Sequence, residues 1–350
     1  MNNLSLFNKV IYLINSICLL LLILSYISPY INPSFFWPIS FLGLLFPILY
    51  ITNCIFLVYW IIKSKKQILS NIIILAIGLK YLGLYIGPTS DNATVKNSIK
   101  ILSYNVRLFN HYKWINKDNI KNKIIDFLNK QDADILCIQE YYDNKEIKLL
   151  NYPYQNIGSD TKKNKWHMAI YSKYPQIKNG IINIEGEEKY NTCIYSDIVI
   201  KYDTIRVYNI HLASNWFNNN DYSFIKNPKK TDIKKGLLGI VKKMRYSYKK
   251  RSKEVNVIYN HIKKSPYPNI IAGDFNDTPL SYAYNTIKKD LIDSFEISGK
   301  GIGKSFIQIP ALRIDYILHD KRLNSYNYMQ HNEKLSDHYP ISCEINITNP

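Results

Sequence analysis

The sequence has 350 residues, with 45 lysines and arginines against 27 aspartates and glutamates, and a formal net charge of +18 at pH 7. This balance favours polyanionic partners, namely nucleic acid, phospholipid headgroups or phosphorylated sugars, although a merely solvated basic surface has the same composition. The five cysteines show no CxxC spacing, so the sequence predicts neither a disulfide framework nor a structural zinc site.

The first 90 residues predict a membrane region. They contain no aspartate, glutamate or arginine, and their only charges are five lysines. Three apolar runs, 10–27, 35–62 and 69–86, predict about three transmembrane helices, because a bilayer core requires about 20 apolar residues per helix. The third run is the weakest because Lys80 interrupts it. A cleaved signal peptide or buried soluble helices are the alternatives, and both fit three successive runs less well.

The lysines predict the orientation of these helices. The cluster "KSKKQ" lies between the second and third runs and is expected on the cytoplasmic side. With three spans, the rest of the chain lies outside the cytoplasm, as an extracytoplasmic domain of a cell inner membrane protein. If the third run does not span, the domain is cytoplasmic instead. Residues 91–98 are predicted to be a linker and residues 99–350 one α/β domain.

Four short apolar runs in this domain are predicted to be strands that end in polar residues. They are "IKILSYN" with Asn105, "ADILCIQE" with Glu140, "IRVYNIH" with His211, and "NIIAGDFN" with Asp274 and Asn276. Between the first two, "DNIKNKIIDFLNKQ" places apolar residues at helical spacing, with Asp118 or Asn119 as the expected cap. Residues two apart on a strand share a face, so Asp274 and Asn276 are expected to point into one cleft.

Two further segments place acids and a histidine near strands. Asp315 in "LRIDYILHD" lies within an alternating segment, where a buried carboxylate is costly unless it is paired. Asp337 and His338 in "LSDHYPISCEI" directly precede a strand. Each feature alone is typical of a turn, a surface or a structural histidine. Six such sites on separate strands favour one common site.

These residue types are those that cleavage of a phosphate ester requires. Asn105, Glu140 and Asp337 can supply oxygen ligands to a hard divalent cation that neutralises phosphate charge. His211 and Asn276 can hold the non-bridging oxygens while negative charge develops on them.

The same chemistry requires a base for the attacking water. Asp274 or His338 could serve, and the residues leave both open. Asp315 could orient the histidine, as a carboxylate does in an acid–base dyad.

With these residues in view, the sequence resembles the endonuclease/exonuclease/phosphatase superfamily over residues 99–346. The matching segments occur in the family order and are "SYNVR", "DILCIQE", "IYSKYP", "VYNIHLAS", "IIAGDFND", "RIDYIL" and "SDHYPI". The resemblance implies a four-layer αββα sandwich of the DNase I-like type, with two mixed sheets face to face, here preceded by N-terminal transmembrane helices. It also implies a Mg²⁺-dependent hydrolase acting on phosphate ester bonds, with Mn²⁺ as the alternative metal.

The resemblance also implies roles at matching positions. Asn105, Glu140 and Asp337 would lie at the metal, His211 would bond the phosphate, Asp274 and Asn276 would handle water and substrate, and His338 would pair with Asp315. One departure concerns position 107, where some abasic-site nucleases of the family have an acid and this chain has Arg107. That arginine removes a metal ligand and favours a substrate other than an abasic site.

Residues outside these segments add weaker predictions. The lysine-rich connection between "NIHLAS" and "GDFN" contains apolar residues at helical spacing from Val255 to Ile262. It predicts either a phosphate or lipid-surface patch or a solvated helix with a flexible loop. Trp114, Trp166 and Trp216 could wall the substrate cleft or pack in the core.

Together these features predict a membrane-anchored, metal-dependent phosphoesterase. A nuclease-like phosphodiesterase acting on nucleic acid is the first choice. A sphingomyelinase-like or other phospholipid or sugar-phosphate phosphatase is the alternative. A catalytically inactive membrane protein that only binds polyanions is the alternative from another class. The sequence does not distinguish oligomeric states.

Overall fold

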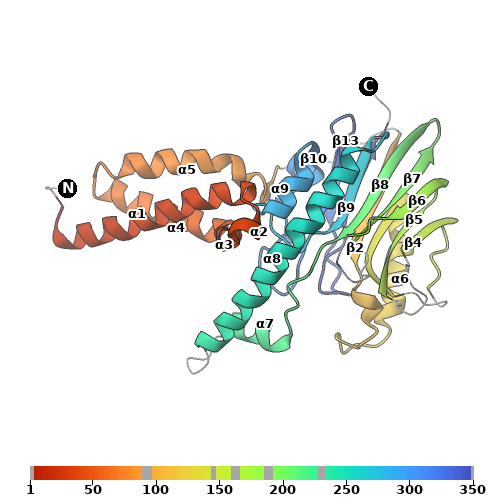
Figure 1. Ribbon diagram of the computed structural model, residues 1–350, viewed down its shortest axis with the longest axis horizontal. Helices are drawn as coiled ribbons and strands as arrows, with labels where there is room; N and C mark the ends of the chain where they lie inside the picture. The colour runs from red at the N-terminus through yellow and green to blue at the C-terminus, as the bar shows by residue number, and fades with distance from the viewer. Residues whose placement is uncertain are drawn as a thin grey trace.

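A computed structural model describes residues 4–88, 97–142, 147–158, 166–184, 192–227 and 233–347. An elongated bundle of helices leaves one side of a β-sandwich, and the N-terminus lies at the far end of that bundle (Figure 1). The bundle consists of α1 (Leu6–Ile27), α4 (Phe46–Ile62) and α5 (Ile68–Leu82). The short helices α2 (Pro33–Phe36) and α3 (Pro38–Leu44) connect α1 to α4 at its domain end.

The bundle is apolar outside and contains buried polar contacts within an otherwise apolar interior. Asn15, Asn53 and Asn71 are fully buried, and the Nδ2 of Asn15 donates to the Oδ1 of Asn53 and of Asn71 at 3.3 and 3.1 Å. Its outward side chains are mostly isoleucine, leucine and valine, including Leu13, Ile51 and Ile73, each more than half exposed. Polar contacts between helices under an apolar surface are typical of membrane bundles.

The helices differ from the three predicted runs in two respects. Of the described residues, the helix over Leu6–Tyr30 is long and apolar enough to span a membrane, and α3 with α4 makes a second if that pair is one span bent by 65°. The run 35–62 is therefore not one helix, because prolines at 38 and 47 begin new helices there. The run 69–86 ends early, at Leu82, and Ile86 enters strand β1 (Ile86–Gly87).

The domain is a sandwich of two six-stranded mixed sheets. The first sheet has the order β13 (Asn324–Gln330), β14 (Ile341–Asn346), β2 (Ser98–Asn105), β3 (Ile135–Tyr142), β5 (Trp166–Ser172), β4 (Tyr154–Gly158). The second has the order β10 (Leu291–Asp293), β12 (Asp315–Asp320), β9 (Asn269–Asp274), β8 (Asp203–His211), β7 (Cys193–Ile200), β6 (Gln176–Ile181). Strand β1 pairs with β11 (Gly301–Ile302).

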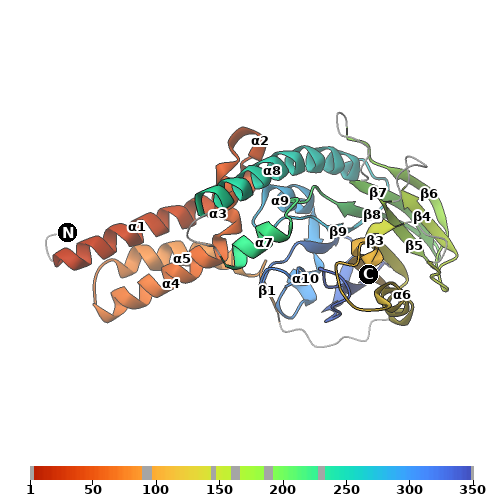
Figure 2. The same cartoon turned by 90° about the horizontal axis from the view of Figure 1, so that it is seen from below.

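Helices cover both outer faces, which completes the predicted four layers. The helix α6 (Ile120–Gln131) covers the first sheet, and its N-terminus lies at Asn119 as expected, although that side chain makes no capping bond. The helices α8 (Ile233–Lys263) and α9 (Tyr282–Lys288) cover the second sheet (Figure 2). Between the sheets lies a core of isoleucine, valine and leucine from both inner faces.

Each sheet has one parallel pair at its centre, and the ends of these pairs come together. In the first sheet β2 is parallel to β3, with Asn105 opposite Gln139. In the second β8 is parallel to β9, with His211 opposite Asp274. A buried amide pair joins the sheets there, since the Nε2 of Gln139 donates to the Oδ1 of Asn209 at 2.7 Å. The carboxyl ends of all four strands therefore meet at one edge of the sandwich.

The bundle docks directly onto the domain. The hydroxyl of Ser28 donates to the carbonyl of Leu280 at 3.0 Å, and the rings of Phe41 and Tyr248 meet edge to face at 5.4 Å. Gly43 is required at this contact, because a Cβ there would lie 2.2 Å from the Leu280 carbonyl oxygen. The bundle and the domain thus form one packed unit.

Candidate active site

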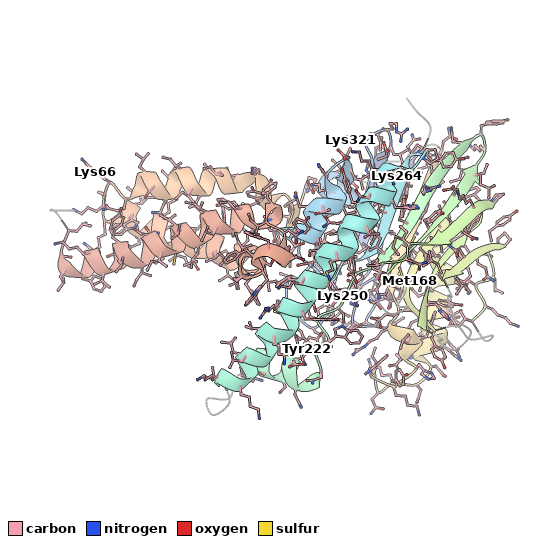
Figure 3. All side chains as sticks on the ribbon, in the orientation of Figure 1. Lys66, Met168, Tyr222, Lys250, Lys264 and Lys321 are labelled. Carbon is pink, nitrogen blue, oxygen red and sulfur yellow. The ribbon has the colours of Figure 1, made fainter. Side chains whose placement is uncertain are left out.

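All eight predicted site residues lie at the edge where the four strands end. Six of them line one cleft of about 410 Å³, namely Glu140, His211, Asp274, Asn276, Asp337 and His338. Asn105 and Asp315 lie just behind it, each 2 % exposed or less. Met168, Tyr222 and Lys250 also line the cleft and mark its position between the first sheet, α7 (Asn219–Lys226) and α8 in Figure 3.

Asn105 connects the residues of the two sheets. Its Nδ2 donates to the Oε1 of Glu140 at 3.2 Å and to the Oδ2 of Asp274 at 3.1 Å. Its Oδ1 accepts from the backbone N–H of Arg107 at 3.1 Å. In this arrangement Asn105 positions two carboxylates.

Glu140 lies at a break in the strand register. The pairing of β3 with β5 shifts between Ile138 and Tyr141, and Glu140 has a φ of +48°, which is rare for a residue with a side chain. The bulge turns the carboxylate into the cleft. Burial, and then the charge of Asp337, raises the pKa of Glu140. Like charges in one cleft repel each other, and a divalent cation between the two carboxylates would relieve that repulsion.

Asp274 ends a strand that approaches its neighbour closely. Gly273 has a φ of +147°, and a Cβ there would meet the Ile210 carbonyl oxygen at 1.9 Å, so only glycine fits. Asp274 is 1 % exposed, and burial raises its pKa to about 6, against the opposing effect of the His338 charge. Its carboxylate thus titrates close to neutral pH.

Asn276 meets Asp274 by a turn, where the sequence had predicted alternation along a strand. Strand β9 ends at Asp274, and Asn276 has a φ of +52°. Its backbone N–H donates to the Oδ1 of Asp274 at 2.8 Å, and its Nδ2 donates to the Oδ2 at 3.2 Å. Both side chains reach the same cleft, but because the chain turns back on itself.

His338 lies between two aspartates. Its Nδ1 is 2.9 Å from the Oδ2 of Asp315, and its Nε2 is 3.6 Å from the Oδ2 of Asp274. Burial opposes the charged form, but the carboxylates of Asp315 and Asp274 hold the pKa of His338 well above its usual range. The ring of Phe306 packs edge-on against the imidazole at 5.0 Å. The two carboxylates therefore favour the protonated imidazole.

Ligand atoms of Asp274, Asp315 and His338 all lie within 4.8 Å of one another. The hydrogen bond that the His338 Nδ1–H donates to Asp315 Oδ2 uses two of these atoms, so the group is an Asp–His–Asp ion-pair relay. A cation is better accommodated by Glu140 and Asp337, whose side chains are 31 % and 16 % exposed at the cleft.

His211 has a buried nitrogen with no hydrogen-bond partner among the described residues. This Nε2 lies 3.7 Å from Glu140 Oε1 and 3.7 Å from Asp274 Oδ2. Burial lowers the pKa of His211. A buried polar atom without a partner is costly, so the nitrogen is suited to bond a ligand in the cleft.

The sequence did not predict the conformation of the segment after Asn105. Arg107, Leu108, Phe109 and Asn110 all have φ between +45° and +58°. Four consecutive left-handed residues are strained, at about 1–2 kcal/mol each. This turn brings the Nε of Arg107 to 3.3 Å from Asp337 Oδ2 and its guanidinium over the Trp114 ring at 4.6 Å. Arg107 therefore contacts a carboxylate of the site.

Aromatic side chains form one wall of the cleft. Trp114 and Trp216 line it, which is one of the two alternatives that the sequence left open for them, together with Phe217, Tyr222 and Phe306. The Trp166 side chain lies outside the described residues. Tyr222 and Phe217 carried no motif that could have identified them. They belong to the connection between "NIHLAS" and "GDFN", for which the sequence did not decide between helix and flexible loop.

The helix α8 holds in place the loop that follows β8, which contributes Trp216 and Phe217 to this wall. The Arg251 guanidinium is 1 % exposed, bonds Asp277 Oδ2 at 3.0 Å and donates to the Ala213 carbonyl at 2.8 Å. The carboxylate of Glu254 accepts from the Ala213 N–H at 2.8 Å. The predicted apolar positions Val255, Ile258 and Ile262 are buried in the same helix. The lysine-rich connection is thus largely helical.

Comparisons with known proteins agree with this geometry. The sequence pattern of the endonuclease/exonuclease/phosphatase family matches residues 102–338, and that of a domain of unknown function matches residues 8–85. No curated protein sequence matches significantly.

Solved structures share the fold at low sequence identity. A functionally unknown conserved protein from Enterococcus faecalis V583 is 18% identical, with 71% of this chain and 99% of that chain covered and a TM-score of 0.54. TDP2 from D. rerio, complexed with single-strand DNA product, is 16% identical, with 72% and 100% covered and a TM-score of 0.53. A mannosyl-6-phosphatase from Bacteroides thetaiotaomicron is 17% identical, with 71% and 99% covered and a TM-score of 0.50.

Proposed function

The chain belongs to the endonuclease/exonuclease/phosphatase family, and from this premise we propose that it is a membrane-anchored, divalent-metal-dependent hydrolase of phosphate esters. The observation that carries the proposal is the convergence of the relay Asp315–His338–Asp274 with Glu140 and Asp337 in one cleft. Members of this family hydrolyse phosphoesters.

Glu140 and Asp337 would hold a Mg²⁺ ion, with Mn²⁺ as the alternative. Asn105 would orient Glu140 through its hydrogen bond, or ligate through its own oxygen. When bound, the cation would neutralise charge on the phosphate as the reaction proceeds.

Asp274 is the better candidate for the base. Its pKa of about 6 leaves it ionised at neutral pH and able to accept a proton from the attacking water. His338 is already protonated between two carboxylates, so it would stabilise the developing negative charge and donate a hydrogen bond from Nε2. Asp315 is a positioning residue, because it acts through the histidine.

Asn276 and His211 would hold the non-bridging phosphate oxygens. The unpartnered Nε2 of His211 faces Glu140 and Asp274, where a phosphate beside the metal would lie. Arg107 would add a cation at the rim of the same position. His211 would act without moving when charge develops on the substrate, whereas Asn276 would exchange one of its bonds to Asp274 and the Leu212 carbonyl for a bond to the phosphate.

A phosphodiester of nucleic acid remains the first proposed substrate. The formal charge of +18 and the aromatic wall of the cleft support it, since bases stack on aromatic side chains. Among the solved structures with this fold, one is complexed with single-strand DNA product and another is a mannosyl-6-phosphatase. The fold is therefore compatible with a nucleic acid and with a sugar phosphate as substrate.

A phospholipid headgroup is the second proposed substrate. One observation favours it: the cleft is lined by apolar residues as well as aromatic ones, among them Leu108, Leu212, Ile309 and Leu312. An inactive polyanion binder is disfavoured, because such a protein would not need the buried relay.

The bundle supports membrane anchoring and an extracytoplasmic domain. Its surface is apolar, and Lys66 lies at the end far from the domain (Figure 3). Lysines at a helix end favour the cytoplasmic side, so, with α5 crossing beside α1 and α4, the domain would lie on the opposite side, in the inner membrane orientation predicted from the sequence for three spans.

The test is an activity screen with the full chain in detergent micelles. Plasmid DNA, RNA, bis-p-nitrophenyl phosphate, phospholipids and phosphorylated sugars are incubated with Mg²⁺, with Mn²⁺ and with chelator. Hydrolysis that requires the metal and disappears in His338→Ala supports the proposal. Absence of hydrolysis for every ester and metal, with intact polyanion binding, would establish the inactive binder instead.

A further inference from the structure

The first turns of α8 present an apolar face that nothing in the described structure covers. Ile233, Leu237 and Leu238 are 44%, 54% and 59% exposed, and Ile225 on the adjacent α7 is 39% exposed. Large apolar side chains gathered at this exposure are unusual on a soluble surface.

This face continues one that is already covered further along the helix. At 100° per residue, Ile233, Leu237, Val241, Met244 and Tyr248 lie on one side of α8, and Leu238 lies at the rim of that side, about 60° beyond Val241. Met244 and Tyr248 are buried, and Tyr248 packs on Phe41 of α3, at the domain end of the apolar bundle. The uncovered turns therefore point to the same side of the molecule as the bundle.

The position of α8 in the molecule agrees. In Figure 1 its N-terminal end and α7 project from the domain on the side from which the bundle leaves. The exposed aromatic residues Phe35 and Phe36, 89% and 51% exposed, lie on α2, which contacts the middle of α8 at Ser252. Exposed aromatic side chains at the domain end of an apolar bundle are typical of the boundary between lipid and water.

The charges flanking the apolar face suit lipid headgroups. Lys234, Lys235, Lys242 and Arg245 are exposed around it. Of the described residues between 219 and 250, Asp221 is the one acid, and Lys243 neutralises it. Basic side chains beside an apolar stripe are the pattern of helices that lie in a membrane interface.

We propose that α7 and the first turns of α8 form a second membrane contact, which lies in the interface of an anionic bilayer beside the spanning helices. This inference rests on the membrane anchoring proposed above. Tyr222 of α7 and Lys250 of α8 both line the cleft, so the contact fixes the cleft mouth close to the lipid surface. The bilayer is the occupant because the face continues the one that packs against the apolar bundle.

The test places a fluorophore on the face in the full chain. Leu238→Cys is labelled with an environment-sensitive dye and reconstituted into vesicles of phosphatidylcholine and phosphatidylglycerol. Ile177→Cys is the matched control, because Ile177 is also 59% exposed and lies on β6, the edge strand far from the bundle. Unsubstituted protein carried through the same labelling gives the background from its native cysteines.

We expect quenching by spin-labelled acyl chains to be several-fold stronger for the Leu238→Cys label than for the control, and quenching by aqueous iodide to be weaker. Lys234→Glu with Lys235→Glu should reduce the acyl-chain quenching in anionic vesicles. If the Leu238→Cys label responds like the control, the inference is overturned. Protection from iodide without acyl-chain quenching would overturn it in favour of a protein partner.

The same vesicles separate this inference from the proposal on which it rests. Alkaline extraction that removes the protein from the vesicles would overturn the membrane anchoring as well. Retention of the protein together with a water-exposed Leu238→Cys label would overturn the second contact alone. Hydrolysis measured on the same sample tests the phosphoesterase proposal independently.

Discussion

Glu140 is the residue through which a bound cation would be held most directly. Its carboxylate is half-buried in the cleft, and burial together with Asp337 raises its pKa, so neutralising it relieves an unfavourable charge. Glu140→Gln retains the shape and the hydrogen bond from Asn105, but it removes the charge.

We expect Glu140→Gln to lower kcat at least about 100-fold and to abolish the rise in melting temperature on Mg²⁺ addition. Glu333→Gln, at an exposed glutamate, is the control and should retain both properties. An unchanged Mg²⁺-dependent thermal shift in Glu140→Gln would show that the metal binds elsewhere.

The relay predicts the pH dependence of hydrolysis. Asp274 must be ionised to accept a proton, so activity should rise as pH increases through about 6. His338 must remain protonated, and its raised pKa should keep activity until the pH lies well above the ordinary histidine range. A bell-shaped profile of kcat/KM is the expected measurement, and an activity maximum below pH 5 would contradict the assignment.

Asp315→Asn should move the alkaline limb of that profile. Without the Asp315 charge the pKa of His338 falls, so activity is lost at lower pH, and kcat should drop by about 10²- to 10⁴-fold. Asp320→Asn, at the other end of β12, is the control, since Asp320 forms its ion pair with Arg322, away from the cleft. Loss of activity without any shift of the alkaline limb would indicate a purely structural role for Asp315.

Among the elements, the strands β13 and β14 are joined by a histidine that makes the stability of the domain depend on pH. His331 follows β13, bonds Ser342 of β14 at 2.8 Å and packs edge-on against Phe127 of α6 at 5.5 Å. Burial lowers its pKa to about 4. The folded chain then binds this proton less readily than the unfolded chain, so stability is fully present above about pH 6.5 and is lost as pH falls towards 4.

This loss amounts to at most about 2 kcal/mol at pH 5, and to less where solvent screens the ring. His331→Gln should therefore lose less stability between pH 7.5 and pH 5 than the unsubstituted protein, as measured by thermal unfolding. His111→Gln, at an exposed histidine, is the control. Equal pH dependence in His331→Gln and the unsubstituted protein would exclude His331 as the cause.

The elements also show what the sequence could predict and why. The strands that end in Asn105, Glu140, His211 and Asp274 were predictable, because each apolar run ends at a polar residue and parallel pairs align such ends. The left-handed turn from Arg107 to Asn110 was not, since residues with ordinary side chains adopt that conformation only when surrounding contacts impose it. The second apolar run is broken at its prolines, because a proline begins a new helix there. A prediction based on the length and hydropathy of the run does not take this into account.

At the scale of the whole molecule, the contact between bundle and domain is specific enough to test by cross-linking. The hydroxyls of Ser34 on α2 and Ser252 on α8 lie 2.9 Å apart. In the full chain, Ser34→Cys with Ser252→Cys should form a disulfide under mild oxidation, seen as a reducible mobility shift. Ser34→Cys with Ser265→Cys, at the distant end of α8, is the control. Equal cross-linking in both pairs would contradict the docked arrangement.

Gly43 tests whether this contact matters for turnover. Gly43→Ala would place a Cβ 2.2 Å from the Leu280 carbonyl oxygen, so the bundle must shift, and we expect a several-fold lower kcat with less Ser34–Ser252 cross-linking. Gly83→Ala is the matched control, since a Cβ at that bundle glycine meets no atom within 4 Å. Full activity in Gly43→Ala would mean that the segment from Asn276 to Leu280 tolerates the displacement of the bundle.

The carbonyl of Leu280 touches the apolar helices, while Asn276, four positions earlier, faces the cleft. No long flexible loop separates these two residues, so a shift of the helices would be transmitted to the cleft. A catalytic domain cut free of its helices would consequently yield kinetic constants for an altered enzyme, and the choice of detergent becomes a variable of the assay itself.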